Sequence, residues 1–315
     1  MQRIFAATIG ALALAIAAPA LGQGSQSGQA APTPRPSPID QVQIGATELA
    51  PGLFELTGYG GNMALLIGPE GPVLVDAQFA PVAGKIKAKV AELAGGAKVK
   101  TLINTHWHGD HTNGNPEFGR EGAEIYAQEN VLKRLTATQV STLFGRETPP
   151  LAKEGLPTRT FKNGMVLKRN GEMLEIRHYP RAHTDGDVTV YFRERDVLHI
   201  GDLLFNGYFP FIDIDSGGTV DGYIAAMEAV LAKLGPNTKV IAGHGPLGDK
   251  AAVQRNLENL KLVRARVAGQ VARGLSLEQA IAEKPLADLD DPWGKFFITQ
   301  DKMTEIVFKD LSRGR

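Results

Sequence analysis

The segment Thr105-His106-Trp107-His108-Gly109-Asp110-His111 has the side chains and spacing to do chemistry. It places three of the chain's seven histidines, together with an aspartate, within six residues. Packing in a hydrophobic core gives no reason for such a cluster, whereas imidazole and carboxylate groups are the usual ligands of catalytic zinc. The segment directly follows the apolar run at residues 99–104, which is typical of a buried strand. We therefore expect a metal site at the end of this strand.

The spacing within the cluster indicates two metal positions. His106 and His108 alternate in an extended segment, so both side chains should point to the same side. Asp110 and His111 follow where the chain turns and should face a second position close by. Asp110 could instead form a turn or cap a helix. Since a catalytic zinc needs about three protein ligands, other segments must supply more.

Three later segments carry suitable ligands where strands are expected to end. His183 lies in a polar turn at residues 180–187, Asp202 ends the run at residues 197–202, and His244 follows the strand at residues 239–242. Gly201 and Gly243 precede two of these ligands, and glycine allows the backbone to approach a metal closely.

The order H-x-H-x-D-H, His-Thr-x-Gly-Asp, Gly-Asp and Gly-His-Gly resembles the metallo-β-lactamase fold superfamily over about residues 42–260. The resemblance implies an α/β fold, an αββα sandwich. In it, two mixed β-sheets pack face to face, with helices on the outer faces and a dinuclear site at one edge.

The resemblance also implies which residue binds which metal. The first metal would be held by His106, His108 and His183, and the second by Asp110, His111 and His244, with Asp202 bridging the two. The expected cofactor is two Zn2+, with iron or manganese as alternatives. Water activated by the metals would attack a polarised carbonyl, and Asp110 would be the catalytic residue that orients this water and passes on its proton.

Composition narrows the classes of protein. With 43% hydrophobic and 22% charged residues the chain is neither disordered nor fibrous, and its zero net charge suggests no nucleic-acid partner. The absence of cysteine excludes disulfides and thiolate ligands. We expect a small-molecule substrate with a hydrolysable carbonyl as the partner. The sequence does not predict an oligomeric state.

The N-terminal residues predict export. Arg3, the apolar run at residues 4–18 and the small residues that follow are typical of a signal peptide at residues 1–22. A membrane anchor is the alternative, but the run is short for one, so we expect no stable membrane insertion after cleavage and a secreted or periplasmic protein. Residues 23–40 predict a Pro/Gly/Ser-rich linker, and residues 41–315 a catalytic domain with C-terminal helices.

Periodicity predicts the elements of this domain. Residues 42–76 should form antiparallel strands joined by hairpins, and residues 136–157 a mobile loop or lid. Further strands are expected at 123–127, 173–178, 188–192, 197–200 and 239–242, and helices at 81–93, 128–135, 223–234, 250–273, 278–282 and 303–311.

Some conspicuous residues match no ligand position. These include His178 and His199. Because His199 lies in an apolar strand, we expect it to be a core residue. Asp185 and Asp187 are expected to orient an imidazole or the His183 turn. Trp107 should pack in the core.

Substrate preference depends on how the sequence departs from the family patterns. β-Lactamases with a cysteine in the second site carry it where this chain has Asp202, and no lysine follows shortly after that position to bind a drug carboxylate. The second-site histidines resemble another β-lactamase branch, while a bridging aspartate resembles glyoxalase II-type thioesterases and lactonases. The leading hypothesis is β-lactam ring opening, and a lactonase or thioesterase is the alternative.

Two other classes of function remain to be weighed. A di-iron redox protein of this fold would carry a glutamate at the position of His108 and a fused flavin domain, and the sequence has neither. A metal-free binding protein is disfavoured by the seven intact ligands.

Candidate substrate contacts lie in two segments. Tyr59 and Asn62 belong to a glycine-rich hairpin that could cover the metals, and Asn206 could hydrogen-bond a substrate carbonyl or carboxylate. Tyr208, Phe209, Phe211 and Ile212 could form an apolar wall, although ordinary core packing would also explain these side chains.

Overall fold

The computed structural model describes residues 38–289 and 293–313. The predicted signal peptide and the linker through residue 37 lie outside the described residues. The last residues of the predicted linker form the single helical turn α1 (Pro38–Gln41). Lys85 Nζ then donates a hydrogen bond to Val42 O at 2.8 Å, which attaches the start of the domain to helix α2.

Seven strands form the first sheet, in the order β1-β2-β3-β4-β5-β6-β9. The first four are antiparallel neighbours, as the hairpin pattern at residues 42–76 predicts, and the last three pairings are parallel. The strands are β1 (Gly45–Ala50), β2 (Leu53–Thr57), β3 (Met63–Leu66), β4 (Val73–Val75), β5 (Thr101–Ile103), β6 (Glu124–Gln128) and β9 (Arg159–Phe161).

Five strands form the second sheet, in the order β10-β11-β12-β13-β14. Its first four strands are antiparallel neighbours, and β13 and β14 pair in parallel, so both large sheets are mixed. The strands are β10 (Gly164–Arg169), β11 (Glu172–His178), β12 (Val188–Phe192), β13 (Val197–Phe205) and β14 (Lys239–His244).

The two sheets pack face to face through one apolar layer. Leu53, Leu66 and Ile103 from the first sheet meet Ile176 and Val190 from the second, and all five are buried. Neighbouring residues on the same strands, such as Leu65 and Leu102, point to the other face because side chains alternate along a strand. Strands such as β3 and β5 therefore contribute to two cores.

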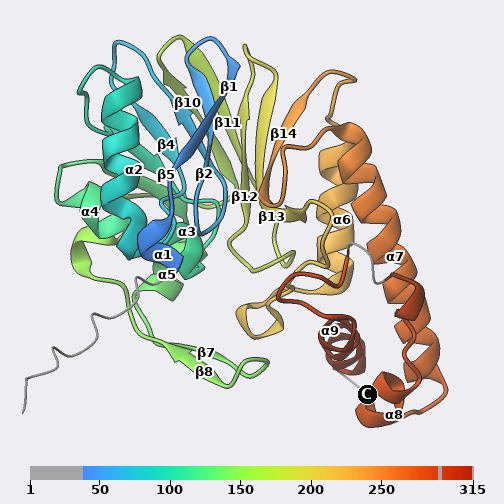
Figure 1. The fold of residues 1–315 in the computed structure, drawn as a ribbon. Coiled ribbons are helices and arrows are strands. Elements are labelled where there is room, and N and C mark those ends of the chain that lie inside the picture. The colour runs from blue at the N-terminus through green and yellow to red at the C-terminus, as the bar shows by residue number, and fades with distance from the viewer. Residues whose placement is uncertain (1–37, 290–292, 314–315) are drawn as a thin grey trace, which may run out of the picture. The chain divides into compact units, whose positions relative to one another are not determined.

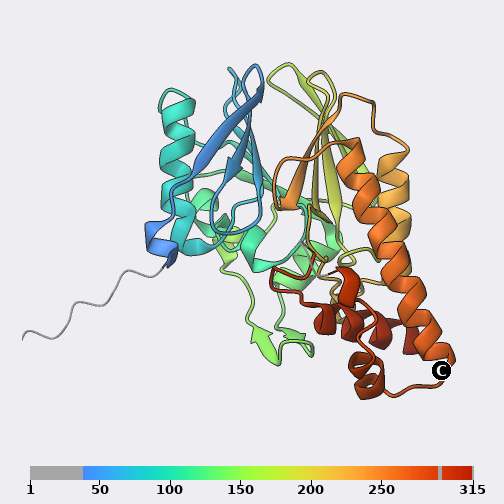
Figure 2. The ribbon, with the colours of Figure 1, turned by 45° about the vertical axis from the view of Figure 1, so that its right-hand side comes forward.

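Helices cover both outer faces, which completes the predicted αββα sandwich (Figures 1 and 2). Helix α2 (Ala80–Leu93) buries Val82, Ile86 and Val90 against the first sheet, beside the short helices α4 (Asn115–Gly119) and α5 (Glu129–Leu135). Helices α6 (Val220–Leu231) and α7 (Lys250–Ala272) cover the second sheet.

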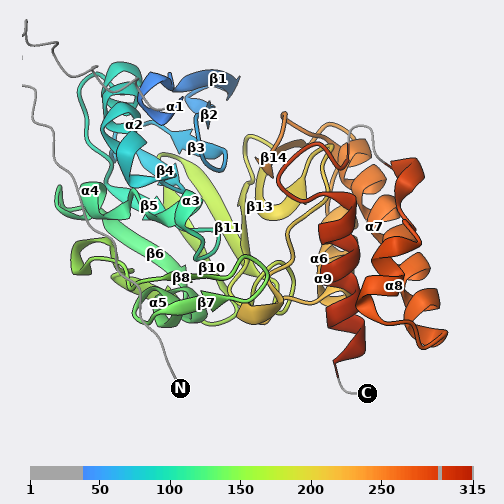
Figure 3. The ribbon, with the colours of Figure 1, turned by 60° about the horizontal axis from the view of Figure 1, so that its bottom comes forward.

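The C-terminal helices form a further layer on α7 that shares its hydrophobic core (Figure 3). Helices α8 (Leu277–Ala282) and α9 (Gln300–Ser312) pack against α7 and against one another, with the turn η3 (Ala287–Leu289) between them. Met303, Ile306 and Val307 of α9 are fully buried in this layer. Among the described residues, no helix has the length and apolar character needed to cross a membrane.

Two predictions about local structure need correction, because residues 136–157 are not irregular throughout and strand β13 does not end at residue 200. Residues 136–157 contain a β-hairpin of β7 (Gln139–Ser141) and β8 (Arg146–Thr148), followed by the turn η1 (Lys153–Gly155). Its strands are too short and too exposed to leave a period in the sequence. Strand β13 also extends past residue 200 to Phe205, with all nine of its residues buried. Asp202 therefore lies within a strand.

Candidate metal centre

All seven predicted ligands lie together at one edge of the two sheets. His106 and His108 lie in the loop after β5, and Asp110 and His111 in the short helix α3 (Gly109–Thr112). The other three belong to the second sheet: His183 in the loop between β11 and β12, Asp202 in β13, and His244 at the end of β14. The ligand atoms form two groups that could each hold a metal ion.

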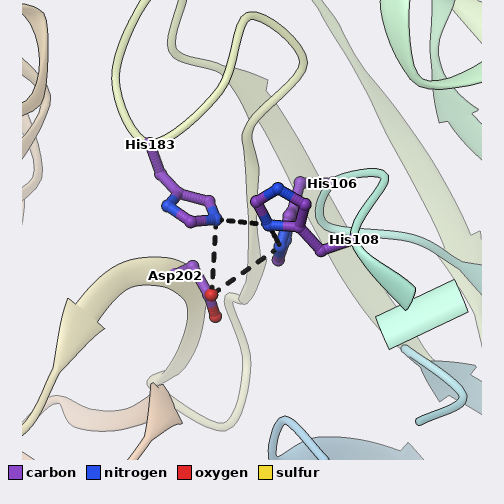
Figure 4. A group of neighbouring side chains, drawn as sticks. All are labelled: His106, His108, His183 and Asp202. Carbon is purple, nitrogen blue, oxygen red and sulfur yellow. Dashed lines mark hydrogen bonds and ion pairs between the residues drawn. The ribbon is translucent and has the colours of Figure 1, made fainter. Parts of the chain in front are cut away.

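The first group contains three imidazoles and one carboxylate (Figure 4). His108 Nδ1 lies 3.1 Å from His106 Nε2 and 2.8 Å from His183 Nε2. Asp202 Oδ2 lies 3.4 Å from His183 Nε2 and 3.7 Å from His106 Nε2. The four donor atoms thus surround one point, as the ligands of a metal ion do.

The second group contains Asp110, His111 and His244. Asp110 Oδ2 lies 3.1 Å from His244 Nε2 and 3.5 Å from His111 Nε2. Asp202 reaches this group too, since its Oδ1 lies 3.1 Å from His111 Nε2. Its carboxylate therefore lies between the two groups, where a bridging ligand is expected.

Two ligand histidines of the first sheet are oriented by one buried aspartate. Asp76 Oδ2 lies 2.8 Å from His111 Nδ1 and accepts a hydrogen bond from Thr105 Oγ1 at 2.7 Å. Thr105 Oγ1 is in turn 3.1 Å from His106 Nδ1. With these outer nitrogens held, the Nε2 atoms of both rings point at the centre, which is the usual way outer contacts fix metal-binding histidines.

The same arrangement holds two more imidazoles. His108 Nε2 lies 2.9 Å from Asp213 Oδ2, and His183 Nδ1 lies 2.6 Å from the carbonyl oxygen of Phe211. Asp213 sits immediately before the turn η2 (Ile214–Ser216) and also accepts hydrogen bonds from two backbone amides of that turn. Asp76 and Asp213 were not predicted from the sequence.

Two buried atoms of the centre have no hydrogen-bond partner. They are His111 Nε2 and Asp202 Oδ1, which lie close together without hydrogen-bond geometry. A buried polar atom left without a partner costs about 1–3 kcal/mol. Because both atoms are good metal ligands, a divalent cation fits the centre and would satisfy them.

Burial and charge act on the proton affinities of the ligands in opposite directions. Burial lowers the pKa of His183 to about 4. Burial also acts to lower the pKa of His244, but the carboxylates of Asp202 and Asp110 outweigh it and raise that pKa to about 9. An imidazole must be neutral to bind a metal, so a cation and a proton compete at His244.

Comparison with known proteins agrees with this centre. The sequence model of the metallo-beta-lactamase superfamily matches residues 56–244, which include all seven ligands. The chain belongs to the metallo-β-lactamase superfamily. As a superfamily member with these ligands it is a metallo-hydrolase.

Its relatives include enzymes with different substrates. Hydroxyacylglutathione hydrolase GloC of Haemophilus influenzae is 31% identical over 47% of this chain and 69% of its own length. The type 2 metallo-beta-lactamases of Bacteroides fragilis and Bacillus cereus are each 26% identical, over 50% and 68% of this chain and 58% and 78% of their own lengths. The superfamily is therefore shared, and these names do not select one substrate.

Solved structures agree on the fold. A metallo-beta-lactamase from Pontibacter korlensis superposes with a TM-score of 0.56 at 20% identity, over 70% of this chain and 99% of its own. The sec-alkylsulfatase Pisa1 from a Pseudomonas species superposes with a TM-score of 0.65 at 16% identity, over 84% of this chain and 50% of its own. These similarities concern the fold alone.

Glycines let the backbone approach the ligands, as the sequence suggests. A Cβ on Gly243 would lie 2.1 Å from Asp202 Oδ1, and one on Gly61 would lie 2.0 Å from the His111 ring. Gly201 adopts a φ of 55° at an irregularity in the pairing of β13 with β14. Such a bulge re-aims the next side chain, here that of Asp202.

The remaining histidines and aspartates have structural contacts. His199 is buried, with its Nε2 3.0 Å from Asn62 O, as expected for a core residue. His178 Nε2 lies 2.9 Å from Asp185 O. Asp187 accepts hydrogen bonds from the amide and hydroxyl of Thr184 and so holds the His183 turn, as predicted.

Asp185 and Trp107 complete this group of predictions. The Asp185 carboxylate pairs with Arg134, and the imidazole that Asp185 contacts, through its carbonyl oxygen, is that of His178, which is not a metal ligand. Trp107 is buried and packs on α5, as predicted for a core residue, and one side of it also borders the cleft beside the metal centre.

The predicted substrate contacts fall into two groups. Tyr59, Tyr208 and Asn62 line the cleft, whereas Asn206 does not. Asn62 Nδ2 donates hydrogen bonds to Ala242 O and Gly245 O, and Asn206 Nδ2 donates to Pro246 O. Both amides thus support the backbone around His244, and their N–H donors are used within the protein.

Of the side chains predicted to form an apolar wall, some line the cleft and others are buried in the core. Phe211 lines the cleft and stacks on the His108 ring, with centroids 5.5 Å apart. Phe209 and Ile212 are fully buried in the core beneath the helices.

Several side chains that line the cleft were missed, five of which are aromatic or cationic. These five come from the start of α2, from the β7–β8 hairpin and from the segment before α9: Phe79, Phe144, Arg146, Phe296 and Phe297. The sequence contained one clue to these residues, the pair Phe296-Phe297. Two adjacent large apolar side chains outside any predicted helix or strand suggest a contact surface.

Proposed function

We propose that this protein is an exported hydrolase that binds two zinc ions and opens a β-lactam ring. The observation that carries the proposal is the orientation of the ligands. Four of the five imidazoles have their outer nitrogen held by an acceptor and their other nitrogen aimed at the centre. Imidazole and carboxylate donors in this arrangement suit zinc.

The chemistry follows from the centre and its one accessible carboxylate. Zinc ions bound here would polarise a carbonyl oxygen and lower the pKa of water toward about 7. The Asp110 side chain, 24% exposed, borders the cleft and lies 3.1 Å from His244 Nε2. It is placed to accept a proton from the attacking water and to deliver it to the leaving group.

The β-lactam substrate is supported by the relatives in Bacteroides fragilis and Bacillus cereus and by the size of the cleft. The cleft has two lobes of about 540 and 430 Å³, which suits a drug-sized molecule. A thioester is the second candidate. It is favoured by the similarity to GloC and by the aspartate at position 202, and a lactone would need the same chemistry.

A hydrolysis panel tests the proposal. The full chain is loaded with zinc and assayed on a penicillin, a cephalosporin, a carbapenem, an acyl-lactone and a glutathione thioester. We expect two zinc ions per chain and the highest kcat/KM on a β-lactam. A higher kcat/KM on the thioester would show that the substrate is a thioester and not a β-lactam. Bound iron with visible absorbance would refute the proposal that the protein is a zinc hydrolase.

Export is tested separately. The proposal rests on the apolar run at residues 4–18 and the small residues after it. N-terminal sequencing of protein from the extracytoplasmic fraction should give a start near Gln23, whereas full-length protein in the cytoplasm would contradict it.

A further inference from the structure

The mouth of the cleft is lined by aromatic rings, two of which come from outside the segment that matches the superfamily. Phe296 and Phe297 are 41% and 44% exposed and belong to the segment before α9. Their centroids are 4.9 Å apart, and Tyr208 lies 5.0 Å from Phe296. Tyr59, 48% exposed, faces the same lobe. Large apolar side chains left in water beside a reaction centre mark a surface that binds an apolar group.

A cation lies at the junction of the two lobes. Arg146 lines both, and among the described residues that line the cleft it is the single lysine or arginine. Its guanidinium lies 5.2 Å from the centroid of Phe144, and no ion pair with a described residue neutralises it. A guanidinium held over an aromatic face and free of a carboxylate partner suits a bidentate carboxylate ligand.

The hairpin that carries Arg146 is held at two points. The amide and hydroxyl of Thr142 donate to the Asp215 carboxylate, at 2.7 Å for the amide. Lys302 of α9 donates to Leu143 O at 3.1 Å. These contacts fix the hairpin to the turn η2 and to the C-terminal helix, so Arg146 is presented on a supported element.

We propose that the cleft selects substrates that carry both an aromatic or long aliphatic group and a carboxylate. The apolar group binds against Phe296 and Phe297, and the carboxylate binds Arg146, with the scissile carbonyl between them near Asp110. The proposal rests on the hydrolase function above and makes it specific. Arg146 and Phe297 both line the two lobes that Asp110 borders, so a substrate held by both groups would be oriented beside Asp110.

Binding of three small probes to the zinc-loaded full chain tests the proposal without any turnover. The probes are 4-phenylbutanoate, its neutral amide and acetate, measured by calorimetry. Arg146→Ala should weaken 4-phenylbutanoate about tenfold and the amide far less. The double variant Phe296→Ala/Phe297→Ala should weaken both aryl probes about tenfold and leave acetate unchanged.

Matched controls come from α7, away from the cleft. Arg255→Ala removes an exposed arginine and Leu262→Ala an exposed apolar side chain, and neither should change any affinity. Arg146→Lys, which keeps the charge, should retain part of the discrimination between acid and amide. Equal affinity of Arg146→Ala and the native protein for 4-phenylbutanoate would mean that the carboxylate binds elsewhere, and would overturn the proposal.

The same variants separate this proposal from the function on which it rests. On ester substrates that carry a carboxylate, Arg146→Ala should raise KM and change kcat little. If no carbonyl substrate is hydrolysed but the binding differences hold, the hydrolase proposal fails and the specificity of the cleft stands. If hydrolysis occurs with no preference for apolar anions, the specificity fails and the hydrolase stands.

Discussion

Replacing Glu55 by glutamine should stabilise the protein at neutral and alkaline pH. Glu55 lies on β2 between Thr47 of β1 and Ala64 of β3, and its side chain shares the inner face of the sheet with Leu53. It is 6% exposed, and its Oε1 atom is buried without a hydrogen-bond partner. Burial raises the pKa of this carboxyl from its ordinary 4.5 to about 7.

The sign and size of the effect of Glu55 on the free energy of unfolding follow from its pKa in the folded and in the unfolded chain. Below pH 4.5 Glu55 is protonated in the folded and the unfolded chain, so its ionisation costs nothing. Between pH 4.5 and 7 only the unfolded chain loses the proton freely, and the native protein is progressively destabilised. Above pH 7 the cost is constant at about 3 kcal/mol, because each tenfold change in proton affinity corresponds to about 1.4 kcal/mol.

Urea unfolding of both proteins from pH 4 to 8.5 measures this effect. Glu55→Gln keeps the shape of the side chain and cannot ionise, so its advantage should be near zero at pH 4 and reach about 3 kcal/mol above pH 7. Titration of the metal ligands is common to both proteins and cancels in the difference. A difference that is independent of pH would refute the reasoning.

Three further predictions concern the metal centre. Asp202→Ala should bind one metal ion per chain and lose about 100-fold or more in activity; elemental analysis that still finds two would remove Asp202 from the bridge. Asp213→Ala frees His108 Nε2, so metal affinity should fall about 10- to 100-fold in competition with a chromophoric chelator, while the circular dichroism spectrum stays native. Gly61→Ala places a Cβ 2.0 Å from the His111 ring and should reduce metal content, whereas Gly84→Ala, which meets nothing within 4 Å in α2, should leave it unchanged.

The metal ligands could be predicted because each lies in a short segment whose residue types indicate its role. His106 and His108 follow an apolar strand directly, and Asp202 and His244 follow glycines that only a close approach requires. These patterns need no knowledge of long-range contacts. The alternation of apolar residues likewise predicts the strands, and with the family resemblance it predicts the two sheets and their helices.

The residues that orient the ligands left no such pattern. Asp76 is 35 residues from His111, and Asp213 is 105 residues from His108, and each meets its imidazole only after the sheets have packed. Asp76 also has a φ of 65°, which places its carboxylate beneath the cluster but which no neighbouring residue type signals. Such contacts depend on tertiary structure, so the sequence of either segment alone could not reveal them.

The C-terminal helix connects the metal centre to the cleft, and this gives the region outside the superfamily match a role in both. Arg313 donates to Ile214 O at 2.7 Å and so braces the turn η2, which follows Asp213. The same turn holds the β7–β8 hairpin through Asp215, and α9 holds it again through Lys302. One helix thus supports the aspartate that orients His108 and the hairpin that carries the substrate-binding cation. Loosening α9 should therefore weaken metal binding and substrate selection together, whereas a change confined to the tip of the hairpin should affect selection alone.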